Sequence, residues 1–450
     1  MIKNYKYRLY PTDTQSQQLD WTLARCCELY NAALQERKDA WDACKQHPNF
    51  YDPQWRKEHA AEYSVNYYDQ ANALPELKRE IRPEYRAVGA HVLQEVLRRV
   101  DKTFQAFFRR VRTGATPGYP RFKSRTHYDS FSFPDHAGWK LTGSRLSITG
   151  LGSEAPYAVA NEAAATIRIP PATDTSYLAF APAGGKEATL RVMPRKGSIK
   201  VKLHREIQGT IKTCMIKREG KCWYVVFACE VAACPLPLSY EDVGIDLGVT
   251  HFAALSDGTF IEQPRYYRRS EKKLASAQQT LARKKRGSHR RKKAVAHVAR
   301  CHRKVRNQRR DFQHKASRSL VDQYQLLAFE KLQEKNMVRR PKPKKDEQGK
   351  YLPNGAAAKG GLNKSIHDAG WRQFVSMVSA KAASAGRTVM PVNPHKTSQI
   401  CSACLEEGPH KDLSERTHTC VHCGVVLDRD HNAALNILRL GRSLQGTKVS

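Results

Sequence analysis

Two Cys-x-x-Cys pairs near the end of the chain constrain its fold more than any other feature. The first pair is Cys401 and Cys404, and the second pair, Cys420 and Cys423, follows after fifteen intervening residues. Each pair places two soft thiolates on one tight turn, and four such thiolates complete the tetrahedral shell that Zn²⁺ prefers. The spacing therefore predicts a structural zinc ribbon.

Two alternatives to this site are open from the sequence alone. The four thiols could be unrelated residues of a reduced protein, or a nearby histidine, His418 or His422, could replace one cysteine. We expect both histidines to be bystanders. Directly after the ribbon, Asp428 and Asp430 precede an amphipathic helical stretch at 433–440. An acid in such a place can simply cap the helix, and this interpretation stays open for Asp428.

The charge of the chain limits its partners. The net charge of the 450 residues is +34, and lysine and arginine occur throughout the chain rather than in one tail. Such a distribution favours a polyanion that touches several domains, nucleic acid more than an anionic membrane. The hydrophobic content of 40% indicates a globular protein. A chain of this length is expected to form roughly two to four domains.

The sequence also indicates where the protein works. No apolar run reaches the roughly 18 residues of a membrane-spanning helix. The first ten residues contain no apolar segment, so we expect no signal peptide. Twelve cysteines, four of them in the two pairs, suit a reducing cytoplasm better than a disulfide framework. We therefore expect a cytoplasmic protein without a membrane partner.

The N-terminal part is predicted to be a strand followed by helices. Residues 3–10 alternate basic with aromatic or apolar side chains, which indicates a strand. Pro11-Thr-Asp-Thr then begins a helix, and a further apolar stripe at helical spacing runs from Leu93 to Val111. The other side of that stripe is either a solvated face or a contact with a nucleic-acid backbone, and it carries Arg98, Arg99, Lys102, Arg109 and Arg110.

After Gly114–Lys123 the hydrophobic period changes to two, which predicts a β-rich region. Short strands are expected at 130–133, 166–169, 189–192, 199–203, 213–217 and 222–231, the last two joined by a turn at 218–221. Strands of this length favour a small β-barrel, with 150–164 as a loop or insertion. Because the strand at 3–10 precedes the helices, we expect it to join the barrel, with the helices inserted.

A carboxylate interrupts the next apolar stretch. Residues 243–258 are predicted to form a buried strand, a Ser-Asp-Gly turn and a return strand, with Asp246 inside the first apolar run. A buried carboxylate is unfavourable by several kcal/mol unless it is paired or binds a metal. A turn role fits Asp246 poorly because the turn comes later in the chain, so we predict a functional role.

Residues 266–324 are predicted to form a densely basic helical hairpin with a turn at Gly287-Ser-His. Its charges repel one another unless a partner neutralises them. A nuclear-localisation signal is an alternative, but basic clusters are common in nucleic-acid-binding proteins. The two clusters are Arg283, Lys284, Lys285 and Arg286, and Arg290, Arg291, Lys292 and Lys293.

The remaining segments precede the ribbon. Residues 325–330 form a second predicted apolar strand, which ends in the carboxylate of Glu330. A Pro/Gly/Lys-rich segment at 339–361 is predicted to be a mobile loop. An amphipathic helix at 371–385 and a strand at 388–392 follow.

Three separated acids, Asp246, Glu330 and Asp430, stand on or beside these strands and the last helix. An RNase H-like fold uses acids in this arrangement to hold two Mg²⁺ ions, since Mg²⁺ prefers hard oxygen ligands and keeps part of its water shell. Two such ions, about 3.5–4 Å apart, activate a water and stabilise the leaving oxygen. The triad therefore predicts a two-metal hydrolytic site, for Mg²⁺ or alternatively Mn²⁺.

Several motifs together resemble those of one family. Near the start these are Tyr7-Arg-Leu-Tyr-Pro, Tyr30-Asn-Ala-Ala-Leu and Gly118-Tyr-Pro-Arg-Phe. Later come Gly244-Ile-Asp-Leu-Gly-Val, Leu327-Ala-Phe-Glu-Lys-Leu, Ser365-Ile-His-Asp-Ala-Gly-Trp, the two cysteine pairs and Asp428-Arg-Asp-His-Asn-Ala-Ala-Leu-Asn-Ile. In this order, and over nearly the whole chain, they resemble TnpB proteins. These are transposon-encoded, RNA-guided DNA nucleases related to compact type V CRISPR effectors.

The resemblance implies an α/β multidomain fold. A split RNase H-like (RuvC) nuclease domain would carry an inserted zinc ribbon, and a wedge-type β-barrel would carry an inserted helical recognition domain. The implied segments are barrel strand 1–12, helical domain 13–117, barrel 118–240, RuvC 241–395, ribbon 396–425, third RuvC motif 426–441 and tail 442–450. The regions 150–182 and 339–361 depart from the family pattern.

The resemblance also implies a function. The family's three catalytic acids fall on Asp246, Glu330 and Asp430, with Asp428 as the nearest competitor for the third role. The implied cofactors are Mg²⁺, structural Zn²⁺ and a guide RNA. The implied partner is double-stranded target DNA with a short flanking motif, which a monomer would bind in a prokaryotic cytoplasm, at the nucleoid when acting.

Alternatives are a compact CRISPR effector and an RNA-guided regulator that binds without cutting, although the intact acids disfavour the regulator. Arg121 and Lys123 join the basic residues above as expected nucleic-acid contacts.

Overall fold

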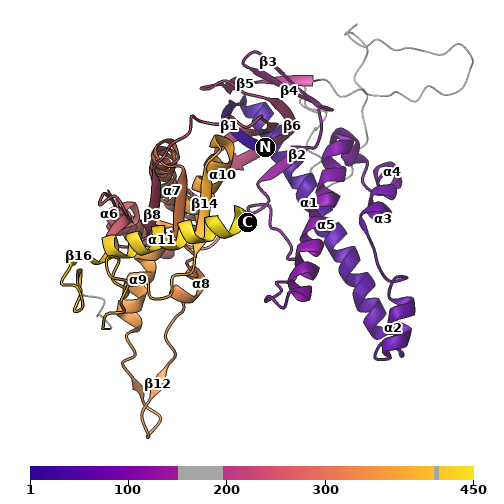
Figure 1. The fold of residues 1–450 in the computed structure, drawn as a ribbon. Coiled ribbons are helices and arrows are strands. Elements are labelled where there is room, and N and C mark those ends of the chain that lie inside the picture. Colours follow the sequence, from indigo (N-terminus) through magenta and orange to yellow (C-terminus); the bar gives the residue numbers. More distant parts are fainter. Residues whose placement is uncertain (150–195, 410–414, 450) are drawn as a thin grey trace, which may run out of the picture. The chain divides into compact units, whose positions relative to one another are not determined.

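The computed structural model describes residues 1–149, 196–409 and 415–449. The chain divides into two compact units, Ile2–Val231 and Ala232–Ser450, and Met1 groups with the second (Figure 1). The division falls nine residues before the boundary predicted at 240. The backbone N–H groups of Cys234 and Leu236 donate to the carbonyls of Ser384 and Ala385, at 2.9 and 3.0 Å, which fixes this stretch to the second unit.

A seven-stranded antiparallel sheet forms the first unit's framework. Its spatial order is β2-β6-β7-β1-β5-β4-β3. The strands are β1 (Ile2–Tyr10), β2 (Ser130–Phe133), β3 (Trp139–Thr142), β4 (Arg145–Thr149), β5 (Lys196–Lys202), β6 (Thr210–Glu219) and β7 (Cys222–Glu230). The N-terminal strand pairs with β5 and β7, so it belongs to the sheet, as expected.

The sheet curls because alternate side chains of all its strands enter one core. Tyr5 and Tyr7 of β1 are buried there, as is Phe227 of β7. Trp139 on the edge strand β3 lies 5.4 Å from Phe227, measured between ring centroids, although three strands separate β3 from β7. A flat sheet cannot make this contact, so the layer has the barrel-like curvature predicted.

The helices of the first unit follow β1, as expected for an insertion. They are α1 (Asp13–Gln46), α2 (Pro53–His59), α3 (Tyr67–Asn72), α4 (Leu74–Glu76) and α5 (Ala90–Arg112), with a π-turn at Leu77–Ile81 and a 3₁₀ turn at Pro83–Ala87. Thr12 begins α1 with a capping box, accepting from the N–H of Gln15 at 3.2 Å. The apolar stripe of α5 is buried as far as Phe104, whereas Val111 is exposed.

The predicted strands of this unit are confirmed where the structure describes them, with two omissions. The hairpin of β6 and β7 turns at Gly220, whose φ of 65° lies in the left-handed region that glycine adopts without strain. The strands β3 and β4 were not predicted. The strands expected at 166–169 and 189–192, and the loop at 150–164, lie outside the described residues.

A mixed five-stranded sheet lies at the centre of the second unit. Its order is β10-β9-β8-β11-β14, with β8, β11 and β14 parallel and the β8–β9 and β9–β10 pairs antiparallel. The strands are β8 (Asp242–Asp246), β9 (His251–Leu255), β10 (Phe260–Glu262), β11 (Leu326–Glu330) and β14 (Thr388–Val392). Strands alternating with helices thus form the α/β sheet that was predicted.

Six helices belong to the described part of this unit. They are α6 (Tyr266–Ala282), α7 (His289–Gln323), α8 (Glu334–Met337), α9 (Ala356–Ala369), α10 (Trp371–Ala385) and α11 (Arg429–Val449). One core joins β8, β9 and β11 to α7 and α10 through Phe252, Phe329 and Phe374. A smaller core joins β11 and β14 to α11 through Ala328, Val392 and Ile437.

Three predictions in this unit need correction. The Ser256–Gly258 turn joins β9 to β10, because the chain already reverses between β8 and β9. The 339–361 segment, predicted to be a single mobile loop, is not a loop over its whole length. It contains a short hairpin, β12 (Lys344–Lys345) and β13 (Tyr351–Leu352), and the first turn of α9. The last helix begins at Arg429 rather than 433, so Asp430 lies inside its first turn.

No helix among the described residues is long and apolar enough to cross a membrane.

Candidate active site

Two of the three predicted acids end neighbouring parallel strands. In the register of β8 and β11, Ile245 lies opposite Phe329, so Asp246 and Glu330 follow at the same level of the sheet. Ile245 and Phe329 are fully buried and hold the strand ends in the core. The sequence places each carboxylate directly after an apolar run, and the parallel pairing then brings both to one edge.

The third acid, Asp430, reaches this edge because α11 packs very closely on β8. A Cβ at Gly244 would lie 2.0 Å from the carbonyl oxygen of Ala434, so only glycine permits the approach. Asp430 Oδ2 is 3.8 Å from the position that a Cβ of Gly248 would occupy, in the loop that follows Asp246. Three segments far apart in sequence therefore meet at the carboxyl ends of β8 and β11.

Burial and mutual repulsion raise the pKa values of these acids. The pKa of Asp246 is held well above its usual range, first by burial and then by the charges of Glu330 and Asp430. Burial raises the pKa of Glu330 and that of Asp430 as well, and Asp428 adds to the effect on Asp430. Half-buried carboxylates that repel one another are suited to hard divalent cations such as Mg²⁺.

The carboxylates are more widely spread than the cysteines. Among the described residues, the four cysteines are the only group of at least three possible metal ligands whose ligand atoms all lie within 4.8 Å of one another. Arg416 faces the acids, with its Nη1 3.8 Å from Asp430 Oδ2, and the charge of Arg429 also acts on Asp246 and Asp430. The three carboxylates therefore lie at one sheet edge but are not as tightly grouped as the four thiols.

Asp428 caps the N-terminus of α11. Its Oδ1 accepts hydrogen bonds from the backbone N–H groups of Asp430 and His431, at 2.8 and 3.1 Å. These groups have no partner within the helix, so the capping interpretation of Asp428 is the one that the geometry supports. By fixing the first turn of α11, this cap also fixes the backbone of Asp430.

The four cysteines form a compact cluster. The Sγ atoms of Cys401 and Cys423 are 3.7 Å apart, and those of Cys404 and Cys420 are 3.6 Å apart. A zinc tetrahedron with bonds of about 2.3 Å has edges of about 3.8 Å, so the spacing fits Zn²⁺. The strands β15 (Thr417–Thr419) and β16 (Val426–Asp428) frame the second pair. Neither His418 nor His422 belongs to the cluster, as expected.

Both cysteine turns share one backbone geometry. The N–H of Leu405 donates to the carbonyl of Cys401, and the N–H of Gly424 donates to that of Cys420, both at 3.0 Å. Leu405 and Gly424 each follow the second cysteine of a pair, and both have a left-handed φ, of 68° and 74°. This repeated turn aims two thiolates inward from each pair.

Two asparagines on α11 tie the ribbon to the helix that carries Asp430. The side chain of Asn432 accepts from the N–H of Ser402 at 2.9 Å and donates to the carbonyl of Ile400 at 2.8 Å. Asn436 donates to the carbonyls of Thr397 and Ile400, at 3.0 and 2.8 Å. Sequence reasoning missed both residues. Their spacing of four on an otherwise apolar helix face is the signal that could have revealed them.

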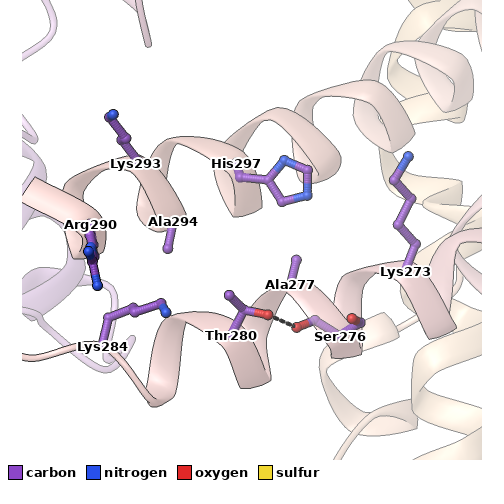
Figure 2. Close-up of a pocket in the computed structure, with 9 residues that line it drawn as sticks. All are labelled: Lys273, Ser276, Ala277, Thr280, Lys284, Arg290, Lys293, Ala294 and His297. Carbon is purple, nitrogen blue, oxygen red and sulfur yellow. Dashed lines mark hydrogen bonds between the residues drawn. The ribbon is translucent and has the colours of Figure 1, made fainter.

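The basic hairpin of α6 and α7 contains a hollow of about 460 Å³ (Figure 2). Small side chains, among them Ala277 and Ala294, leave the space between the helices. Lys284 and Arg290 lie toward one end of the hollow and His297 toward the other (Figure 2). Lys273 and Lys293 also line it. Lys273 and His297 were not predicted, although helical spacing places them on the facing sides.

The predicted basic residues differ in what they contact. The guanidinium of Arg99 donates to the carbonyl of Ser130 at 2.8 Å, and that of Arg291 closes the α6–α7 turn by donating to the carbonyls of Leu281 and Lys284, at 3.0 and 3.1 Å. Lys102 pairs with Glu95. The exposed members are Arg98, Arg109, Arg110, Arg121, Lys123, Arg283, Lys285, Arg286, Arg290, Lys292 and Lys293.

Curated relatives match nearly the whole chain. A "Putative RNA-guided DNA endonuclease" of Streptomyces pristinaespiralis is 30% identical over 439 residues, which cover 97% of this chain and 89% of the relative. The "Putative RNA-guided DNA endonuclease InsQ" of Escherichia coli is 25% identical over 445 residues, covering 98% and 93%. A TnpB-like protein of Acanthamoeba polyphaga mimivirus is 28% identical over 155 residues, covering 34% and 27%.

Three family models match separate parts of the chain. The model described as "Probable transposase" matches residues 227–340, and the Cas12f1-like TNB domain matches 371–437, which include both cysteine pairs. A "Helix-turn-helix domain" matches residues 1–46, where this structure has the strand β1 and the single helix α1.

Two solved structures are also similar. A Cas12f1–sgRNA–target DNA complex has 13% identity and a TM-score of 0.30, covering 97% of this chain and 99% of that one. The mini-RNA-guided endonuclease CRISPR-Cas phi3 has 10% identity and a TM-score of 0.43, covering 98% and 92%.

Proposed function

The chain belongs to the TnpB family of RNA-guided DNA endonucleases, and from this premise we propose that it cleaves DNA at a target chosen by a guide RNA. Base pairing between guide and target strand reads most of the sequence in such a system, while the protein contacts backbone and a short flanking duplex motif. The net charge of +34 suits a protein that holds both an RNA and a DNA duplex.

We propose Asp246, Glu330 and Asp430 as the catalytic residues. The observation that carries this proposal is their convergence: they come from three distant segments, and each has its pKa raised by burial. A group of acids whose pKa values are raised together is typical of functional sites. Mg²⁺ or Mn²⁺ held by these carboxylates would supply Lewis acidity toward the scissile phosphate and a lowered pKa for a bound water.

The neighbouring side chains orient these acids. Thr397 donates a hydrogen bond to Oε1 of Glu330 at 2.8 Å, which leaves the other oxygen, Oε2, for a ligand. Asp428 fixes the first turn of α11 and so the position of Asp430. Asp246 lies at the end of β8, where the sheet hydrogen bonds hold its backbone. The carboxylates are thus preorganised by the protein.

We infer that the hollow between α6 and α7 receives a phosphate of the bound nucleic acid. The hollow is surrounded by Lys273, Lys284, Arg290, Lys293 and His297. A backbone phosphate bound there would neutralise positive charge and relieve the repulsion among these side chains. The exposed arginines of α5 offer a second basic surface on the first unit. These surfaces suit sequence-independent contacts, which position a duplex without reading its bases.

The remaining features of the proposal follow from the family. The domain segments are those predicted from the sequence, with residues 232–240 assigned to the nuclease unit. The four cysteines hold a structural zinc ion, and the protein acts as a monomer in a prokaryotic cytoplasm, at the nucleoid. Light scattering of the RNA-bound protein tests the monomer.

The test begins with expression of the protein together with its native flanking DNA and sequencing of the RNA that copurifies. The 3′ end of that RNA is then reprogrammed against a plasmid with randomised flanks, in the presence of Mg²⁺. We expect guide-dependent cleavage beside one flanking motif, abolished in Asp246→Ala. Asp242→Asn is the matched control, since Asp242 lies at the opposite end of β8 and pairs with Arg442 at 2.9 Å.

Other results would replace the proposal. Guide-dependent binding without cutting would identify an RNA-guided regulator. A bound RNA whose guide derives from a repeat array would identify a compact CRISPR effector. Absence of any copurifying RNA would overturn the RNA-guided function.

A further inference from the structure

A second, larger hollow lies beside Glu330. It is a groove of about 780 Å³ between α10 and the parallel strands β11 and β14, and the segment 331–336 that follows β11 forms one of its walls. Glu330 and Leu247, the residue after Asp246, both line it. The groove therefore adjoins the carboxylate cluster at Glu330, and it lies wholly within the second unit.

The interior of the groove is aromatic and aliphatic. Phe329, Trp371, Val375 and Pro391 line it, and the small side chains of Ala382 and Ala383 leave it room. Trp371 is buried, and its indole N–H has no hydrogen-bond partner among the described residues. A wall of this kind accepts a flat, weakly polar group and offers a donor to an acceptor that enters deeply.

The lining of the groove also carries cations. Lys331, Lys335 and Arg372 are exposed, and none of them forms an ion pair among the described residues. The nearby acid Glu334 is already engaged, because its Oε1 accepts from the backbone N–H of Arg372 at 2.6 Å. Apolar walls with cations beside them complement a nucleotide, whose base is flat and whose phosphates are anionic.

We propose that this groove receives one unpaired base of the DNA strand, next to the phosphate held at the carboxylates. The neighbouring phosphates contact Lys331, Lys335 and Arg372. The proposal rests on the proposed nuclease function, since that function supplies the strand. A base seated here anchors the strand one or a few nucleotides from the bond to be cut. A paired base cannot enter, so the groove selects single-stranded DNA at the cleavage step.

The test uses a substitution that fills part of the groove. Ala383→Trp places a large side chain in the groove and leaves Asp246, Glu330 and Asp430 themselves unchanged. Ala380→Trp is the matched control, because Ala380 is exposed on the same helix but does not line the groove. Guide-bound proteins are given target DNA in which a single abasic nucleotide is moved through the positions around the cut.

We expect a loss of cleavage of roughly ten-fold at one abasic position with the wild-type protein, the size of one stacked base. Ala383→Trp should cut intact DNA about as slowly as the wild type cuts DNA with the critical abasic position, and its rate should not depend on where the abasic nucleotide lies. Ala380→Trp should match the wild type in both respects. The groove proposal would be overturned if the wild type cut all abasic substrates at the same rate, or if Ala383→Trp cut as fast as the wild type. Either result would leave the proposed nuclease function standing.

A second measurement separates this proposal from the proposed function. Single-stranded DNA carrying 2-aminopurine is titrated into Asp246→Asn protein, with or without Ala383→Trp. Fluorescence quenching that Ala383→Trp removes and Ala380→Trp preserves supports the base site even if no guide-dependent cleavage is found. Identical quenching in all three proteins would contradict it, and the groove would then suit an apolar peptide rather than a base.

Discussion

Thr397 donates a hydrogen bond from its Oγ1 to Oε1 of Glu330, at 2.8 Å. Thr397 is buried and lies just before the first cysteine pair, and its carbonyl accepts from Asn436 of α11 at 3.0 Å. One residue thus connects the zinc ribbon, the helix that carries Asp430 and the carboxylate that ends β11. The ribbon is in this way part of the structure that holds the proposed catalytic site.

Thr397→Val should lower activity more than stability. The substitution keeps the shape of the side chain but removes the hydroxyl, so Glu330 can rotate. We expect DNA cleavage to fall by about ten-fold, with a loss of unfolding free energy of only about 1 kcal/mol for one hydrogen bond. Cleavage rates and denaturant unfolding check this. Thr397→Ser is the matched control, because it restores the hydroxyl and should recover most of the activity.

Cys420→Ser should release the metal and misplace Asp430. Loss of one thiolate weakens a zinc site strongly, since the binding energy of the metal is also folding energy of the ribbon. We expect a zinc content well below one per chain, and cleavage reduced at least about ten-fold. Metal analysis and cleavage assays on one preparation check both. Cys234→Ser is a suitable control, because Cys234 is exposed and outside the cluster. Full zinc content with full activity in Cys420→Ser would refute the four-thiolate site.

Some of this arrangement could be predicted from the sequence and some could not. The bounds of α10, the strand at Thr388–Val392 and the cysteine cluster follow from local patterns, because each depends on residues close together in the chain. The hydrogen bond between Thr397 and Glu330 joins residues 67 positions apart, and no local pattern encodes it. Gly244 is a similar case. Only the folded structure shows that the carbonyl of Ala434 lies too close to position 244 for any side chain.

Asp428 offers a test of capping against metal binding. Asparagine caps a helix about as well as aspartate, whereas alanine loses about 1 kcal/mol at an N-cap. We therefore expect Asp428→Asn to retain both stability and cleavage, and Asp428→Ala to lose stability by about that amount. Thermal unfolding and cleavage rates measured side by side decide the matter. A loss of Mg²⁺-dependent cleavage in Asp428→Asn, with its stability intact, would assign Asp428 to the metal site instead.

Charge reversal in the α6–α7 hollow should weaken nucleic-acid binding in a salt-dependent way. In the triple variant Lys284→Glu, Arg290→Glu and Lys293→Glu, the slope of log affinity against log salt should shrink by about 0.9 for each phosphate that the protein no longer neutralises. Affinity for guide RNA and for duplex DNA, measured over a range of salt, gives this slope. The control is Lys284→Arg, Arg290→Lys and Lys293→Arg, which keeps every charge. Equal slopes for the two triple variants would show that these side chains form only a solvated face.

Asp246→Asn should stabilise the metal-free protein at neutral pH. Burial, followed by the charges of Glu330 and Asp430, raises the pKa of Asp246 in the folded state. The folded protein therefore binds more protons than the unfolded chain above the ordinary pKa of an aspartate. The stability contributed by this group is complete below that ordinary pKa and is lost as pH rises through the folded pKa. Asparagine has no proton to lose, so the variant escapes this loss.

Thermal unfolding in the presence of a chelator, from pH 4 to pH 8, checks the expectation. The wild type should lose stability more steeply with rising pH than Asp246→Asn does, and added Mg²⁺ should stabilise the wild type much more than the variant. Asp242→Asn provides the contrast: the same substitution in the same strand removes the ion pair with Arg442 and relieves no repulsion, so it should not raise stability. Equal pH dependence of the wild type and Asp246→Asn would mean that neither burial nor the neighbouring acids raise the pKa of Asp246, and the proposed metal site would lose its electrostatic basis.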